Sequence, residues 1–184
     1  MLKKLLLELS PRQTWALVAL ACAGLLGFGL YLQHGVGLEP CPMCIVQRYA
    51  MTGMGLVALL AVFWHSGWVG YVLTGLGTAM AAGGAFVAAR QSWLQWYPPE
   101  TLSCGRDFYG MVESFPLQRA IPMIFRGGGD CTKIDWTFLG GSIANWSFVF
   151  FMGIFVLMLI LRFRDGLFST PRNLENLESL EPLS

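Results

Sequence analysis

Cys41 and Cys44 stand three residues apart in the stretch Cys41-Pro42-Met43-Cys44, directly before a long apolar run. Two thiols at this spacing can form a small disulfide that opens and closes by exchange with other thiols. If the apolar run is a helix, the pair lies at its start, where the positive end of the helix dipole favours the reactive thiolate. The sequence therefore predicts a redox-active cysteine pair at the beginning of a helix.

Arg48 follows Cys44 by four residues, so on a helix both side chains lie on one face, about 6 Å apart along the axis. A charge placed a few residues into an apolar segment is costly and indicates function by default. A guanidinium there can stabilise a thiolate and bond a carbonyl oxygen on a ligand. The alternative is an arginine that reaches back to the membrane interface. The neighbouring Gln47 lies on another face and indicates a packing or interface residue.

Cys104 and Cys131 form a second candidate pair, in a segment punctuated by Pro98-Pro99 and by Gly127-Gly128-Gly129. One interpretation is a permanent disulfide that staples this segment. A staple normally holds a folded unit, but this segment shows little apolar core, and a disulfide in an exposed loop is more open to exchange. We therefore favour a redox role. Cys22 differs from these four, because it lies within an apolar run and is expected to be a small buried residue.

A metal site is the main alternative for the cysteines. A Cys-x-x-Cys pair is half of a zinc site, which needs about two more Cys or His ligands. His34 lies nearby, and Cys104 and Cys131 could complete the set. The chain has no second Cys-x-x-Cys pair, however, so disulfide chemistry is favoured and no metal is expected.

The elements that must position these residues are membrane helices. Of the 184 residues, 55% are hydrophobic and 12% are charged, against about 25% charged in soluble domains. Four runs reach the roughly 20 residues that cross a bilayer: Thr14–Gln33, Ile45–Trp64, Val69–Ala89 and Ile143–Leu161. The sequence thus predicts an all-α membrane protein whose four-helix transmembrane bundle spans residues 1–165. A net charge of +1 gives no electrostatic case for binding nucleic acid.

Small and aromatic residues fit this prediction. Glycines inside membrane helices let the backbones approach closely, as expected for Gly24, Gly27, Gly29, Gly75, Gly77, Gly83 and Gly84. Aromatic residues near the proposed ends fit an interfacial belt: Trp15, Tyr31, Trp64, Trp68, Trp93, Trp96 and Trp146. The first run could instead be a cleaved signal peptide, but it exceeds the usual apolar core of about 7–15 residues.

Four spans place both termini on one side and leave a long loop, residues 90–142, between the third and fourth. Basic residues favour cytoplasmic termini by a small margin. The four loop cysteines decide more, because stable disulfides belong outside the reducing cytosol, which for a bacterium means the periplasm. Within the loop, Phe115–Phe125 is either a short helix on the membrane surface or a segment packed on the helix ends. The tail, residues 166–184, is expected to be disordered in solvent.

With these features the chain resembles the DsbB family of bacterial disulfide bond formation proteins, over about Trp15 to Leu161. The residues that carry the resemblance are Cys41-Pro-Met-Cys44 followed by Arg48, the loop cysteines Cys104 and Cys131, and the segments Gln95-Trp-Tyr-Pro98, Gly129-Asp-Cys131 and Trp136-Thr-Phe-Leu-Gly140. The combination is specific, although each part alone is not.

The resemblance implies an inner-membrane enzyme that reoxidises a DsbA-like periplasmic thioredoxin-fold protein. By that match, Cys104 forms the mixed disulfide with the partner and Cys131 is its original disulfide mate. Electrons then reach Cys41 and Cys44, and Cys44 contacts a quinone with help from Arg48. The acceptor would be ubiquinone or menaquinone from the respiratory pool.

One position departs from the family pattern. Gln91 stands near the end of the third run, where family members carry His. Glutamine cannot be protonated, so a proton-donating role is in doubt there, but a neutral hydrogen bond to quinone remains open. Three rival classes also stay open: a four-span structural or adaptor protein with stapling disulfides, a metal-binding membrane protein, and a vitamin K epoxide reductase-like enzyme. The last generally places its Cys-x-x-Cys near the end of its final spans.

Overall fold

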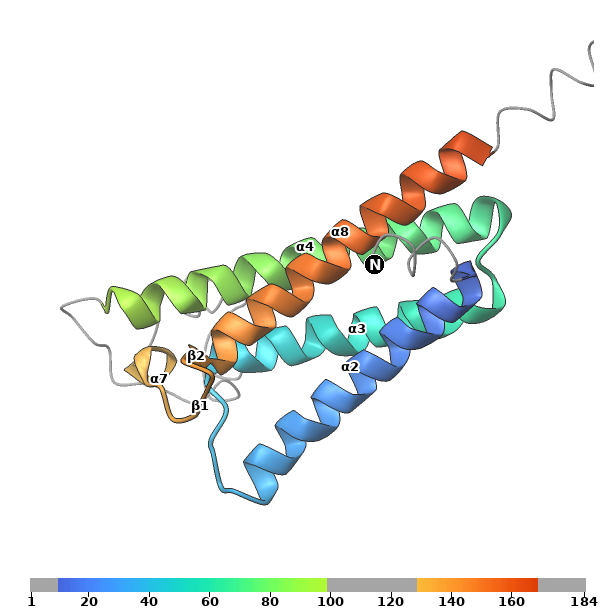
Figure 1. Ribbon diagram of the computed structural model, residues 1–184. Helices are drawn as coiled ribbons and strands as arrows, with labels where there is room; N and C mark the ends of the chain where they lie inside the picture. Colours follow the sequence, from blue (N-terminus) through green and yellow to red (C-terminus); the bar gives the residue numbers. More distant parts are fainter. Residues whose placement is uncertain (1–9, 99–128, 169–184) are drawn as a thin grey trace, which may run out of the picture.

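The computed structural model describes residues 10–98 and 129–168. These contain four long helices: α2 (Pro11–His34), α3 (Pro42–Phe63), α4 (Gly67–Trp96) and α8 (Ile143–Phe168). Between α4 and α8 lie a short helix, α7 (Gly129–Thr132), and two short strands, β1 (Thr137–Phe138) and β2 (Gly141–Ser142). Figure 1 shows α7 and both strands at the end of the bundle where α3 begins. The expected four-helix architecture is confirmed.

All four long helices are long and apolar enough to cross a membrane. Each corresponds to one predicted run, although α3 ends at Phe63, one residue before the predicted Trp64. The first two start earlier than the apolar pattern because of their capping residues. Ser10 caps α2 in a reciprocal pair with Gln13, and proline occupies the first turn. Cys41 caps α3, and its sulfur accepts the backbone N–H of Cys44. The first cysteine of the pair therefore has a structural role as well as a chemical one.

The last two long helices extend beyond the predicted runs. α4 continues past Ala89 and ends at Trp96. Tyr97 follows it outside the helix, as expected for a residue that precedes a proline, here Pro98. The expected loop of residues 90–142 thus begins inside a helix. α8 continues past Leu161 to Phe168, so the expected end of the bundle at residue 165 falls within it. The rest of the tail, residues 169–184, lies outside the described residues, as does the Phe115–Phe125 segment.

The described part of the loop contains regular structure where none was predicted. β1 and β2 pair antiparallel, with Thr137 opposite Ser142 and Phe138 opposite Gly141. The turn between them, Leu139–Gly140, has φ of 50° and 79°, as a two-residue hairpin turn requires. Leucine rarely adopts this backbone conformation, which explains why the sequence did not reveal the turn.

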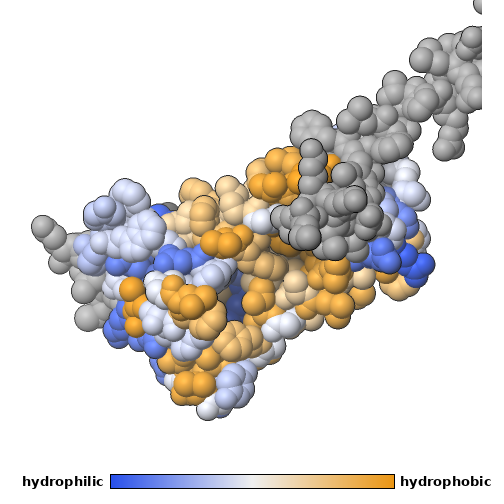
Figure 2. All heavy atoms as spheres, in the orientation of Figure 1, coloured by the Kyte–Doolittle hydropathy of each residue, from blue (hydrophilic) through white to orange (hydrophobic). Residues whose placement is uncertain are grey.

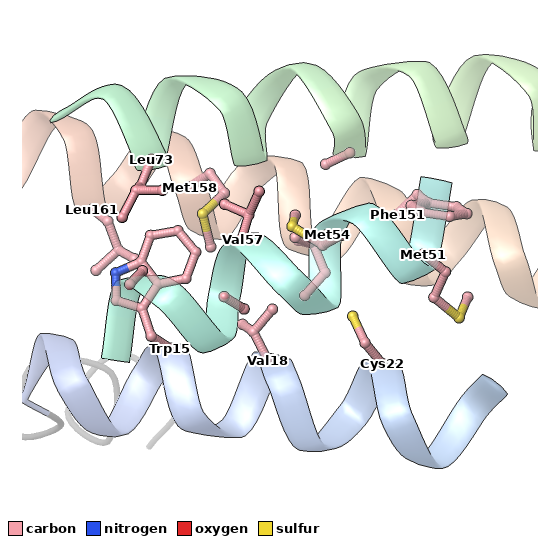
Figure 3. Packing of buried hydrophobic residues seen from close by; sticks show 14 of the residues in the cluster. Trp15, Val18, Cys22, Met51, Met54, Val57, Leu73, Phe151, Met158 and Leu161 are labelled. Carbon is pink, nitrogen blue, oxygen red and sulfur yellow. The ribbon is translucent and has the colours of Figure 1, made fainter. Parts of the chain in front are cut away.

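Neighbouring helices pack in chain order, α2 on α3, α3 on α4 and α4 on α8. Their shared core gathers apolar side chains from all four helices, among them Trp15, Cys22, Met54 and Met158 (Figure 3). Cys22 is fully buried, as predicted. Trp15 is only 3% exposed and belongs to this core, so its expected place in an interfacial belt is wrong. The other aromatic residues of that belt are exposed.

Outside the core, the lipid-facing surface is apolar. Figure 2 shows hydrophobic side chains over the middle of the bundle and polar ones toward its two ends. The close glycine contacts are fewer than predicted. A Cβ on Gly84 would lie 2.4 Å from the ring of Phe151, whereas nothing lies within 4 Å of one on Gly24 or Gly27. Gly84 therefore sets the approach of α4 to α8.

Candidate redox site

The sulfur atoms of Cys41 and Cys44 lie 2.8 Å apart at the start of α3. A disulfide bond is about 2.05 Å long, so a small movement would join them. Cys41 is buried and Cys44 is half-buried. The position expected for this pair, on the first turn of a membrane helix, is the position it occupies.

Cys131 lies on α7 in the same buried cluster as Cys41, together with Met43, Val87 and Leu94. It is fully buried. Hydrogen bonding to the thiols of Cys131 and then Cys44, together with burial, raises the pKa of Cys41 above its ordinary value. The fold therefore brings one member of the predicted second pair against the first. Its predicted mate, Cys104, lies outside the described residues.

Gln91 reaches the cysteine pair from α4. Its amide nitrogen donates to the sulfur of Cys41 at 3.3 Å and to that of Cys44 at 3.2 Å. Its amide oxygen accepts a hydrogen bond from Nε2 of Gln47 at 2.6 Å. Gln91 was predicted to bond a quinone, and that bond stays a prediction. In the structure its amide bonds sulfur.

Gln47 belongs to the site, although the sequence indicated only a packing or interface residue. It is 4% exposed and Gln91 is 3% exposed. Buried amides nearly always find hydrogen-bond partners, and each of these two finds the other. The missed signal was an uncharged polar residue inside an apolar helix, next to the cysteine pair, with a second such residue at the end of another helix.

The Arg48 guanidinium is half-buried and points toward α2. It donates to the side-chain oxygen of Gln33 and, at 3.0 Å, to the carbonyl oxygen of Gly29. The described residues therefore give it acceptors on the neighbouring helix, and no hydrogen bond joins it to Cys44 there. Arg48 ties α2 to α3 one turn below the cysteine pair, and its charge stays on the same side of the helix as Cys44.

A pocket of about 510 Å³ opens between α2, α3 and the start of α8. Cys41, Cys44, Arg48 and Gln91 all line it, so the fold brings together the described residues that were predicted to act with a ligand. Most of its remaining wall is apolar, which is typical of pockets for small organic ligands of roughly 300–1,000 Å³. The wall also includes residues 133–136 and Phe138, from the segment that follows Cys131.

Aromatic rings form one side of this pocket. Trp136 meets Phe28 edge to face, with ring centroids 5.6 Å apart, and stacks on Phe138 at 6.1 Å. The indole N–H of Trp146 donates to the carbonyl oxygen of Phe138 at 2.9 Å. These contacts hold the hairpin against α2 and α8, so the segment that carries Cys131 is also a wall of the pocket.

Within residues 10–98 and 129–168, no three His, Cys, Asp or Glu side chains gather as they would to hold a metal ion. The zinc alternative therefore gains no support from the described cysteines. Their surroundings are two amides, a third thiol and an apolar pocket.

Four helices that are apolar enough to cross a membrane, with clustered thiols beside an apolar pocket, define a multi-pass membrane protein with a candidate thiol redox site. The family described as Disulfide bond formation protein DsbB matches residues 11–161. The chain is 61% identical over 162 residues to disulfide bond formation protein B of Acidovorax sp. (strain JS42), covering 87% of this chain and 92% of that one. It is 66% identical over 157 residues to the protein of that name from Polaromonas naphthalenivorans (strain CJ2), covering 83% and 93%. The chain belongs to the DsbB family.

Proposed function

We propose that this chain reoxidises a DsbA-like thioredoxin-fold dithiol protein in the periplasm and passes the electrons to a membrane quinone. It would then be a protein-dithiol:quinone oxidoreductase of the inner membrane. The observation that carries the proposal is the position of Cys41. Its sulfur meets Cys131 on one side and Cys44 on the other, and the Cys41–Cys44 pair borders the apolar pocket.

The contact of Cys131 with Cys41 suggests how two disulfides exchange. A thiolate of the partner attacks Cys104 of a Cys104–Cys131 disulfide, forming a mixed disulfide and releasing Cys131 as a thiolate. That thiolate attacks Cys41 in the Cys41–Cys44 disulfide, and Cys44 leaves as a thiolate. Each step breaks one S–S bond and forms one.

The exchange then closes on the partner side. The second thiol of the partner attacks the mixed disulfide and frees Cys104, and Cys104 attacks the Cys131–Cys41 bond and frees Cys41. The partner leaves with its disulfide, and two electrons remain on Cys41 and Cys44. DsbA, with a potential of about −120 mV, is among the strongest dithiol oxidants. A strongly oxidising acceptor must therefore follow the cysteine pair.

The pocket residues fit a quinone, either ubiquinone or menaquinone. The donor set suits the ligand, because the Arg48 guanidinium can bond a ring carbonyl oxygen and the apolar wall can cover the ring and its tail. Phe28 and Trp136 offer aromatic surfaces to the ring, and Cys44 borders the same space. A quinone held there would supply a two-electron acceptor that carries the electrons into the respiratory pool.

The proposed function also sets the orientation. Cys41 caps α3 and Cys131 lies on α7, and Figure 1 shows α7 at the end of the bundle where α3 begins. Disulfides persist outside the cytosol, so this end faces the periplasm. On this proposal the opposite end of the bundle, with the start of α2 and the end of α8, faces the cytoplasm, and both termini would lie on that side.

The test mixes purified protein with quinone and a reduced thioredoxin-fold partner and follows quinone absorbance. The intact chain should consume quinone, and Cys44→Ala should abolish the loss. Cys22→Ala is the matched control, since Cys22 is buried in the core away from the pocket and its removal should leave turnover intact. Quinone loss that is the same in the Cys44→Ala variant, or absent in the intact chain, would refute the proposal.

A further inference from the structure

The amide of Gln91 can face the cysteine sulfurs in either of two ways. A carboxamide has an oxygen that only accepts and an NH₂ that only donates, and half a turn about the last side-chain bond exchanges them. The two orientations occupy almost the same space. Packing alone therefore does not decide which end meets Cys41 and Cys44.

Gln47 makes this choice. Its Nε2 lies 2.6 Å from Oε1 of Gln91 and donates to it. With its oxygen held, the NH₂ of Gln91 must point away from Gln47, and its nitrogen lies 3.3 Å and 3.2 Å from the two sulfurs. Both amides are almost completely buried, so water does not compete for these bonds. With Gln47 in the orientation that donates to Gln91 through Nε2, a reversed Gln91 would leave its own NH₂ facing that of Gln47.

The orientation matters because the cysteine pair has two redox states with different hydrogen-bonding needs. A thiolate is a strong acceptor, and hydrogen bonds to a charged atom are roughly twice as strong as neutral ones. The sulfurs of a disulfide carry no charge and gain less from the same donors. An NH₂ directed at both sulfurs therefore favours the reduced pair over the disulfide, which makes the disulfide more oxidising.

We propose that Gln47 is a positioning residue that sets the redox potential of the Cys41–Cys44 pair by holding the amide of Gln91 with its NH₂ toward the sulfurs. The inference rests on the proposed redox role of this pair and adds a residue that acts on it only through another side chain. Among the described residues, no hydrogen bond joins Gln47 to the sulfur of Cys41 or Cys44.

The experiment measures the potential of the pair in the full chain without quinone. The protein is equilibrated with glutathione couples of known ratio, free thiols are alkylated, and peptide mass spectrometry reads Cys41 and Cys44. In this exchange two electrons and two protons pass from two glutathiones to the pair. The Cys41–Cys44 bond breaks, and the S–S bond of oxidised glutathione forms.

Gln47→Met keeps the length of the side chain and removes the donor. We expect the equilibrium constant with glutathione to shift about tenfold toward the disulfide, a fall in potential of about 30 mV for two electrons. Gln91→Met should shift it in the same direction. Combining the two should add nothing to Gln91→Met alone, because Gln47 acts through Gln91. An unchanged potential in Gln47→Met would overturn the proposal. So would a shift from Gln47→Met that is equally large in the intact chain and in the Gln91→Met variant.

Thr74→Val is the control for loss of a buried polar group. Thr74 is buried on α4, and its hydroxyl donates to the carbonyl oxygen of Gly70 at 2.8 Å, so the potential should not move. If Gln47→Met does not fold, Gln47→Asn carries the same test, because its shorter amide cannot reach Gln91. Failure of both to fold would mark Gln47 as purely structural. A pair that never exchanges with glutathione would instead refute the proposed function itself.

Discussion

Gly84→Ala tests the packing of α4, which carries Gln91, against α8, which lines part of the pocket. Gly84 lies on α4 against Phe151 of α8, whose side chain is fully buried. A Cβ at position 84 would lie 2.4 Å from Cε1 and 2.6 Å from Cδ1 of that ring. Because the ring is enclosed in the core, it cannot turn away, and the two helices must separate or the core must repack.

The cost follows from the usual penalty for overpacking a core, about 1–3 kcal/mol. Gly83→Ala is a matched control, since it is the neighbouring position on α4, is exposed, and has nothing within 4 Å of a new Cβ. Both substitutions gain the same helix propensity, about 1 kcal/mol. The difference between the two variants therefore isolates the clash.

The assay is thermal unfolding in detergent. Gly84→Ala should unfold below Gly83→Ala by roughly 2–12 °C, from about 2–4 °C per kcal/mol for a chain of this size. Quinone reduction should fall as well, since α4 carries Gln91 and the neighbour of Phe151, Phe150, lines the pocket. Equal unfolding midpoints for the two variants would refute the packing that we describe between α4 and α8.

Three further predictions concern the site. Arg48→Met should raise the KM for quinone about tenfold or more, because a hydrogen bond to a charged group contributes about 1.5–3 kcal/mol; an unchanged KM would remove Arg48 from the pocket's function. The raised pKa of Cys41 means that less of this thiol is thiolate at a given pH. In the reduced protein, the alkylation rate of Cys41 should therefore begin to rise at a higher pH than the rate of a cysteine in an unfolded peptide. Identical pH dependences of the two rates would contradict this. In Cys131→Ser, the thiol of Cys104 should attack the disulfide of the oxidised partner, forming a mixed disulfide and releasing one partner thiol; a gel without that adduct would exclude Cys104 as the entry point.

The helices could be predicted because lipid imposes a simple rule. A span needs about 20 apolar residues with every backbone group bonded internally, and each of the four runs became a helix. The rule fixes the apolar stretch but not where a helix stops. α4 continues through Arg90 and Gln91 to Trp96. Those residues are compatible with both helix and loop, so the sequence did not show where the helix ends. This extension is what brings Gln91 to the cysteines.

Contacts between helices could not be predicted, because they depend on how each helix is rotated about its axis. The spacing of Cys44 and Arg48 suggested that they act together, yet the guanidinium bonds α2. The bond from Gln47 to Gln91 joins residues on different helices, and no local pattern reports it. Trp15 stood near a predicted span end and became core, since only the packed bundle shows which face of α2 is covered.

The position of Cys41 resolves a difficulty that two cysteine pairs create. A pair that faces a secreted partner must be accessible, whereas a pair beside an apolar pocket must be sheltered. One pair cannot meet both needs, so two pairs are required, and one sulfur has to contact a cysteine of each pair. Cys41 meets this condition, because it is buried, caps α3, and lies against Cys131 and Cys44. In the reduced state of the structure, the neighbouring thiols and burial raise the pKa of Cys41, and a protonated thiol is a poor nucleophile. On the proposed function, reduced Cys41 would therefore be slow to attack a disulfide beside it, which would limit reversal of the exchange.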